Sequence, residues 1–244
     1  MAALMTFELS DTDKIAEYRE ECREMTISIE PPSINTSVFD FVVERTASRE
    51  PVGPTFQSVN ASTAAGGSIR FGLGAIKGVG AKAVAAIVDE RARAGAFGSL
   101  FDFCERIDLS IVNKGALEAM ICAGAFDCTG AMRKAMLDAA ERAMSAGQSL
   151  QKDRRVGQMG LFGMGSQEAT DTLSTARLTT AEWSEAEMLA REKAALGFYI
   201  TKHPLTRRER LLEACVTAST ADLADAKNFP AEMKVTLGGM VSSL

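Results

Sequence analysis

Apolar residues recur every three to four positions through most of the chain, a spacing typical of amphipathic α-helices. Polar capping residues stand before several of these runs, and those at Ser99 and Ser184 have an acidic residue three positions later. Glycine follows several runs, as it commonly does where a helix ends, and Gly147 is expected to end one of them. The predicted helices are residues 11–25, 81–94, a segment that begins after Ser99, 113–123, 131–146 and 184–196.

Shorter apolar segments predict a small amount of β-structure. The candidate strands are residues 27–29, 38–43, 69–71 and 233–241. Residues 46–68 are rich in Ser, Thr, Ala, Gly and Pro, which predicts an exposed insertion between two strands. Residues 147–182 lose their periodicity and collect Gly, Ser, Gln and Thr, which predicts a flexible linker. The expected fold class is therefore mainly α with small β elements, that is, α+β.

The composition is ordinary for a water-exposed globular chain, with 46% hydrophobic and 24% charged residues among 244. No apolar run reaches membrane-spanning length, so no membrane contact is expected. The first residues lack the basic leader of a secretory signal and are expected to belong to the interior of a larger domain. The five cysteines form no C-x-x-C pair and His203 is the single histidine, which argues against a zinc site. Free thiols favour a reducing, cytoplasmic location.

The charge is distributed unevenly, which matters more than its net value of -5. Residues 1–50 carry eleven acidic and five basic side chains, whereas residues 70–95 carry five basic and two acidic ones. A local basic stretch is sufficient for a small phosphate-binding site.

The basic stretch contains the most informative local motif, Gly74 to Ala83. Gly78-Val79-Gly80 between two helical segments is the pattern of a helix-hairpin-helix, in which glycines allow a tight bend with exposed backbone N–H groups. These groups begin a helix, so its positive dipole end can hold a phosphate. Val79 is expected to point into the core, and Lys77 and Lys82 to add charge-assisted contacts. Such a site contacts the DNA backbone without reading bases.

A simpler interpretation of this motif remains open at this point. The glycines could simply suit a plain turn between helices that binds nothing. Residues 107–114 form a degenerate second copy that lacks the glycines, and we expect it to be a structural partner that shares one core with the first.

A second motif lies in the predicted linker. Gln158-Met159-Gly160-Leu161-Phe162 places two large apolar residues in a polar segment, and exposed apolar anchors of this kind are typical of a docking peptide. Gln158 would hydrogen-bond a groove while Leu161 and Phe162 fill a pocket, with Met159 beside them. The alternative is that these apolar side chains fold back onto the protein's own surface.

Several strings together resemble the alpha-subunit family of bacterial DNA polymerase III, the C-family replicative polymerases. They are spread in order over most of residues 1–205. The strings are Glu21-Cys22-Arg23-Glu24-Met25, Pro31-Pro32-Ser33-Ile34-Asn35, residues 70–80, Ser99 to Cys104, Leu117-Glu118 through Asp127, and Leu196 to Tyr199 with His203-Pro204-Leu205.

The resemblance implies a domain order. It assigns residues 1–70 to the end of a fingers domain, 71–130 to a tandem helix-hairpin-helix domain, and 131–182 to a helix and a linker. It assigns residues 183–212 to a connecting helix and 213–244 to a linker and the first strand of an oligonucleotide-binding barrel.

The resemblance also implies the activity and the partners. Lys77, Gly78, Val79, Gly80 and Lys82 would bind the backbone of duplex DNA. Gln158, Met159, Leu161 and Phe162 would bind the ring-shaped sliding clamp, in the company of other replicase subunits near the nucleoid.

The polymerase's palm domain, whose aspartates hold two Mg²⁺ ions, is expected upstream of this chain. The sequence shows no carboxylate cluster that could replace that domain, so no catalytic or metal residue is predicted and the chain alone is expected to be inactive. Two other classes stay open: a stand-alone helix-hairpin-helix module of a repair protein or ligase, and a purely structural or interaction domain. Within the family, an error-prone paralogue remains an alternative to the main replicase.

Overall fold

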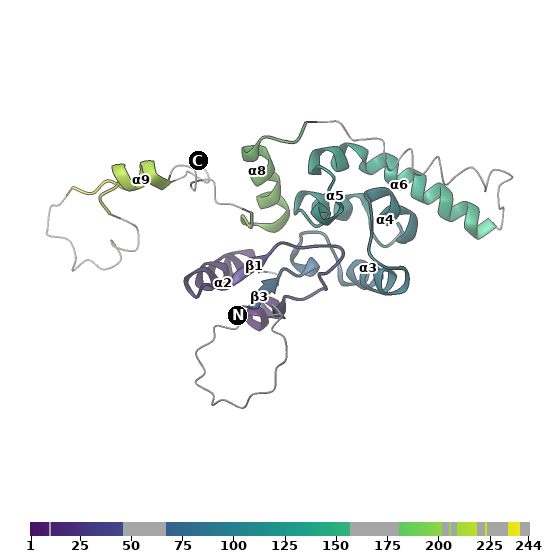
Figure 1. Ribbon diagram of the computed structural model, residues 1–244, viewed down its shortest axis with the longest axis horizontal. Helices are drawn as coiled ribbons and strands as arrows, with labels where there is room; N and C mark the ends of the chain where they lie inside the picture. The colour runs from purple at the N-terminus through teal and green to yellow at the C-terminus, as the bar shows by residue number, and fades with distance from the viewer. Residues whose placement is uncertain are drawn as a thin grey trace, which may run out of the picture. The chain divides into compact units, whose positions relative to one another are not determined.

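The computed structural model describes residues 1–9, 11–45, 67–156, 181–201, 205, 209–218, 223 and 234–239. The chain divides into two compact units, Met1–Ile200 and Thr201–Leu244. The first unit holds a small sheet and a series of helices that includes both hairpins (Figure 1). The predicted α+β class, mainly helical with a little sheet, is confirmed. Within the part of the chain that the structure describes, no helix combines the length and apolar character needed to cross a membrane.

The N-terminal part of the first unit consists of two helices and a three-stranded sheet. Helix α1 is Ala2–Phe7, and α2 is Thr12–Glu24, whose N-cap Asp11 accepts hydrogen bonds from two backbone N–H groups of its first turn. Strands β1 (Ser28–Glu30), β2 (Val42–Arg45) and β3 (Gly67–Arg70) form a sheet in the order β1-β3-β2. Strand β3 pairs parallel with β1 and antiparallel with β2, which places Ile69 between Ile29 and Val43.

Two predictions about this sheet need correction. The strand predicted at 38–43 begins only at Val42, because the backbone carbonyls of Val38 and Phe39 accept hydrogen bonds from Leu73 and Gly74 rather than from a strand. The apolar character of this run reflects packing, since Phe41 makes an edge-to-face contact with Phe71 at 4.7 Å between ring centroids. The insertion predicted at 46–68 is shorter at its end, because residues 67 and 68 belong to β3; residues 46–66 lie outside the described residues.

The helices that carry the two hairpins follow the sheet. They are η1 (Leu73–Ala75), α3 (Ala81–Ala94), α4 (Leu100–Arg106), α5 (Lys114–Cys122), η2 (Asp127–Thr129) and α6 (Arg133–Val156). The predicted cap at Ser99 is confirmed, since its side-chain oxygen accepts the backbone N–H of Asp102. Asn113, predicted as the first residue of a helix, is the N-cap of α5 and accepts the backbone N–H of Ala116. The helix predicted at 81–94 has the bounds that the sequence indicated.

Helix α6 is longer than predicted, and Gly147 lies inside it rather than at its end. A Cβ atom at this position would collide with the backbone carbonyl of Cys104 in α4. Glycine therefore serves here to let two helices approach closely, which is a tertiary role that local sequence does not reveal. Residues 147–156 of the predicted linker are consequently helical, and residues 157–180 lie outside the described part of the chain.

Helix α8 (Glu185–Leu196) begins at the predicted cap Ser184 and ends at Gly197 in the left-handed conformation. Just before it, the Glu182 carboxylate accepts the backbone N–H groups of Arg133 and Lys134 at 2.8 and 3.0 Å and so caps α6. Burial alone would raise the pKa of Glu182, but hydrogen bonds from Trp183, Lys134 and Arg133 lower it. Sequence reasoning assigned residue 182 to the linker and missed this contact.

The second unit contains helix α9 (Glu209–Cys215). The strand predicted at 233–241 is wrong over its described residues, 234–239, which have no regular secondary structure. The Thr217 backbone N–H donates to the Thr236 carbonyl, and the Thr236 backbone N–H donates to the Thr217 hydroxyl. Between these described residues a single point of pairing does not make a strand, because a strand requires a ladder of partners.

One hydrophobic core joins the sheet to both hairpins. Its aromatic centre is the series Phe97, Phe103 and Phe126, with successive ring centroids 5.0 and 5.1 Å apart. Val79 of the first hairpin and Val112 of the second are both buried in it. The expectation that the two hairpins share a core is confirmed.

Candidate nucleic-acid interface

The first hairpin is the bend between η1 and α3. Gly78 has a φ of +80°, a left-handed conformation that side chains rarely adopt, so glycine is required there. The Val79 N–H donates to the Ile76 carbonyl at 3.1 Å and closes the turn. Val79 is 5% exposed, so it anchors the bend to the core as predicted.

The outer side of this bend carries backbone donors without acceptors. The N–H groups of Gly78, Gly80, Ala81 and Lys82 have no hydrogen-bond acceptor among the described residues. Gly80 is the N-cap of α3 and supplies no side-chain cap. All four residues are exposed, and a Cβ atom at Gly78 or Gly80 would meet nothing within 4 Å, so this side of the bend faces open space.

Two lysines flank these donors. The side chains of Lys77 and Lys82 are exposed, and neither forms an ion pair with a carboxylate in the described ranges. The backbone N–H of Lys77 donates to the Ala195 carbonyl at 3.0 Å, which fastens the bend to the end of α8. The lysine charges are therefore available while their backbone is held in place.

A concavity of about 540 Å³ lies beside the bend. Residues 74–80 form most of its lining, and Leu9 and Thr12 complete it. The start of α3 combines N–H groups that have no acceptor among the described residues with two exposed lysines. Such an arrangement can attract an anion such as a phosphate group. Contacts to phosphate carry no sequence information directly.

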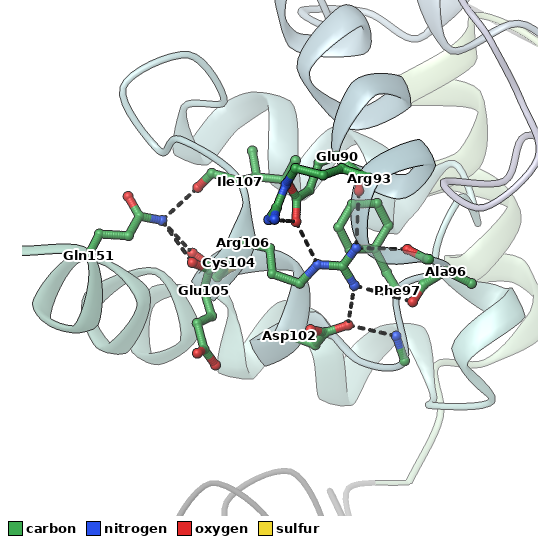
Figure 2. A network of polar contacts seen from close by, with 12 residues as sticks. Glu90, Arg93, Ala96, Phe97, Asp102, Cys104, Glu105, Arg106, Ile107 and Gln151 are labelled. Atoms are coloured by element: carbon green, nitrogen blue, oxygen red, sulfur yellow. Dashed lines mark hydrogen bonds and ion pairs between the residues drawn. The ribbon is translucent and has the colours of Figure 1, made fainter. Parts of the chain in front are cut away.

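Arg106 in α4 holds the far end of α3 in place (Figure 2). Its guanidinium donates to the Glu90 carboxylate at 3.0 Å and to the carbonyls of Gly95 and Ala96, and it lies 4.3 Å from the centre of the Phe97 ring. It also donates to Asp102 at 3.0 Å. One side chain thus connects α3, the loop after it and α4.

Gln151 of α6 makes a comparable connection at the end of α4, also visible in Figure 2. Its side-chain amide donates to the carbonyls of Cys104, Glu105 and Ile107 at 3.0, 3.3 and 2.7 Å. These carbonyls lie at a helix end, where a backbone partner is missing. Sequence reasoning missed both Arg106 and Gln151, because their partners are carbonyls and carboxylates that no local pattern identifies.

The second hairpin connects α4 to α5, and two of its side chains accept hydrogen bonds from its own backbone N–H groups. Asn113 accepts the Ala116 N–H at 2.8 Å, and Asp108 accepts the backbone N–H and the hydroxyl of Ser110. The N–H groups of Asn113, Lys114 and Gly115 have no acceptor among the described residues. The second hairpin therefore differs from the first mainly in its side chains.

The predicted docking peptide cannot be placed beside the two hairpins. Its residues Gln158, Met159, Leu161 and Phe162 lie outside the described residues, shortly after α6 ends at Val156. Its role therefore stays a prediction from the sequence.

Metal and thiol chemistry have little support in the described part of the chain. No three side chains of His, Cys, Asp or Glu converge there in a way that could hold a metal ion. The described residues therefore do not fit the Mg²⁺ ions that the resemblance implies for the polymerase reaction. The five cysteines are free, and burial raises the pKa of Cys104 to about 12, so that thiol stays protonated at neutral pH.

Comparison with known proteins agrees with this geometry. The family described as "Helix-hairpin-helix motif" matches residues 26–136, a range that includes both hairpins. The chain thus carries a helix-hairpin-helix domain.

The relatives of this chain indicate a narrower class of protein than the family model does. The chain is 33% identical over 248 residues to DNA polymerase III subunit alpha of Saccharopolyspora erythraea, a match that covers all of the chain and 19% of the relative. It is 40% identical over 214 residues to the subunit of Deinococcus radiodurans, covering 88% of the chain and 14% of the relative. The subunit of Pasteurella multocida is 35% identical over 243 residues, with 100% and 19% covered.

The resemblance to DNA polymerase III alpha subunits is confirmed by these matches. The chain is a homologue of one segment of that subunit and spans about a fifth of the length of the curated relatives it matches.

Proposed function

We propose that this chain binds the sugar–phosphate backbone of duplex DNA through the bend at Gly78–Gly80, as a segment of a DNA polymerase III alpha subunit in the bacterial cytoplasm. The observation that carries the proposal is the set of backbone N–H groups at residues 78 and 80–82, which have no acceptor among the described residues and lie beside two exposed lysines. Groups of this kind bind phosphate in a sequence-independent way.

The whole-length similarity favours this proposal over the two other classes. A stand-alone repair module would be expected to match polymerase subunits only around the hairpins, whereas the similarity covers the chain from end to end. Against a purely structural turn stand the two exposed lysines, which flank the open N–H groups and form no ion pair among the described residues.

Reversing both lysine charges, Lys77→Glu with Lys82→Glu, is expected to weaken duplex binding and to flatten its salt dependence. Each DNA phosphate that the variant no longer neutralises should reduce the slope of log association constant against log salt by about 0.9. The measurement is a titration of fluorescent duplex DNA at several salt concentrations.

A control with the same change in net charge is Arg23→Glu with Arg142→Glu. Both arginines are exposed and lie on α2 and α6, away from the hairpins. This control should keep the wild-type slope. A wild-type slope in the Lys77→Glu, Lys82→Glu variant would reject DNA binding at the bend.

The second part of the proposal is a tether: residues Gln158, Met159, Leu161 and Phe162 bind the sliding clamp. Support comes from the sequence motif and from its position shortly after α6. Burial of Leu161 and Phe162 offers roughly 3–6 kcal/mol before ordering costs, so the isolated contact should be on the order of micromolar or weaker. A shared DNA molecule would raise its effective strength.

Leu161→Ala with Phe162→Ala is expected to abolish capture of the chain on immobilised clamp, while the thermal unfolding curve stays unchanged. Unchanged unfolding is expected because a docking peptide contributes little to the fold. Full capture of this variant would reject the tether and leave the DNA-binding proposal untouched.

Nucleotidyl transfer, with Mg²⁺ as its cofactor, is proposed for the complete subunit rather than for these 244 residues. The residues that the structure describes contain no metal-binding cluster. We therefore propose that this segment positions duplex DNA and that it is inactive as a polymerase by itself.

A further inference from the structure

The two hairpins can be compared position by position, because each ends in the N-cap of a helix. Gly80 caps α3 and Asn113 caps α5, and their backbone angles are nearly the same: φ and ψ are -85° and 162° at Gly80, and -75° and 168° at Asn113. A buried valine, Val79 or Val112, precedes each cap. The two bends therefore enter their helices in the same way and differ in their side chains.

The two hairpins differ in their side chains rather than in their open backbone donors, since the N–H groups of residues 113–115, like those of 80–82, have no acceptor among the described residues. Asn113 stands where the first hairpin has Gly80, and its Oδ1 lies at the start of α5, where it accepts the Ala116 N–H at 2.8 Å. Ile111, 42% exposed, stands where the first has Gly78. Ser110 and Gly115 replace the two lysines, Lys77 and Lys82.

The charges of the second hairpin also oppose an anion. The Asp108 carboxylate lies in the bend, where it accepts hydrogen bonds from Ser110. The ammonium of Lys114 is 3.3 Å from the Glu141 carboxylate and 4.0 Å from that of Glu118. Lys152 is exposed and lines a concavity of about 270 Å³ that Asp108 also lines. A carboxylate at this position would repel a phosphate group.

We infer that the tandem unit is one-sided: the first hairpin receives phosphate, Asn113 and Asp108 exclude it from the second, and the unit grips one strand of the duplex. This inference rests on the proposed function and adds the strand contacted and the residues that determine it. A unit that holds one backbone contacts single strands and duplexes through the same groups. Any preference for duplex over single-stranded DNA must therefore come from other parts of the subunit.

Exchange of the two caps tests the inference with the full chain. Gly80→Asn should cap α3 as Asn113 caps α5, since the backbone already has the required angles. Thermal stability should stay equal or rise slightly, because asparagine is at least as good an N-cap as glycine. The slope of log association constant against log salt should fall by about 0.9 for each phosphate that the bend no longer holds. A Gly80→Asn variant that binds duplex with the wild-type slope would overturn the role of the cap.

The native second hairpin is tested by Lys114→Ala, which is expected to keep the wild-type affinity and slope. A reduction of that slope by about 0.9 would mean that the second hairpin binds phosphate, and would overturn the one-sided grip. The result is separate from the test of the proposed function, because Lys77→Glu with Lys82→Glu reports on the first hairpin alone.

A gain of function completes the test. Asp108→Asn, Ile111→Gly, Asn113→Gly and Gly115→Lys together remove the carboxylate from the second bend, restore both glycines and add one of the two lysines, and the expected result is a slope steeper by about 0.9. Glu24→Gln with Asp138→Asn makes the same change in net charge at exposed positions outside the hairpins and serves as the control. A slope equal to that of the control would overturn the assignment of these residues as the excluding groups.

Discussion

Replacing Gly147 with leucine is expected to lower the free energy of unfolding by about 3 kcal/mol, although the change improves the helix-forming tendency of α6. The new side chain would meet the backbone carbonyl of Cys104, which belongs to α4 and cannot move without shifting that helix. The same carbonyl accepts a hydrogen bond from Gln151 at 3.0 Å, so separation of the helices would also break that hydrogen bond. Urea unfolding followed by circular dichroism measures the loss.

The smaller substitution Gly147→Ala tests the close approach of the helices by whether it lowers or raises the free energy of unfolding. An alanine in an exposed helix interior normally adds up to about 1 kcal/mol relative to glycine. At Gly147 the added Cβ collides with backbone, so we expect a loss of about 1–3 kcal/mol instead. Gly115→Ala is the matched control, because its Cβ would meet only the Asn113 side chain at 3.5 Å and should stabilise α5 or leave it unchanged. Stabilisation by Gly147→Ala would contradict the close approach of α4 and α6.

Arg106→Met is expected to destabilise the fold by about 2–4 kcal/mol. The variant leaves the carbonyls of Gly95 and Ala96 without their donor and deprives Glu90, whose side chain is 12% exposed, of one of its two arginine partners. Removing one member of a largely buried ion pair costs more than the pair contributes in water, because the remaining charge stays desolvated. Arg106→Lys should recover less than half of the loss, since an ammonium cannot reproduce the guanidinium's planar set of donors.

The effect should depend on pH in a defined direction. Hydrogen bonds from Arg93 and Arg106, opposed by burial, hold the pKa of Glu90 below its ordinary value of 4.5. The stabilisation from these contacts is therefore complete above that ordinary value and is lost as the pH falls through the lowered pKa. The difference between wild type and Arg106→Met should shrink in the same range.

Arg93→Met is the control for Arg106, because Arg93 also contacts Glu90 but is 72% exposed. A surface ion pair of this kind contributes at most about 1 kcal/mol. Equal losses in the two variants would show that burial does not determine the contribution of Arg106.

The local features of this chain could be predicted from its sequence because they depend on neighbours along the chain. Ser99, Asn113 and Ser184 cap helices since a short polar side chain reaches an N–H two or three residues later. Gly78 allows the bend since the required φ is positive. The exposure of Lys77 and the burial of Val79 follow from the same local pattern.

Where the sequence misled, the deciding partner was distant. Gly147 looked like a helix end, but the carbonyl of Cys104 explains it. Val38 to Phe41 looked like a strand, but contacts with Leu73, Gly74 and Phe71 hold it as a loop. Residues 234–239 looked like a strand, and among the described residues they meet Thr217 at one point instead of a ladder.

The sequence by itself determined that the chain is helical with a little sheet, that a glycine bend with two lysines begins a helix, and which family the chain resembles. Each of these depends on residue types at short, regular spacing. Only the tertiary structure decided that the N–H groups of this bend lack acceptors among the described residues, and that Asn113 and Asp108 accept hydrogen bonds within the second bend. It also decided that Arg106, Gln151 and Glu182 hold the helices together. Such contacts join residues far apart in the chain, and no local pattern specifies which groups will meet.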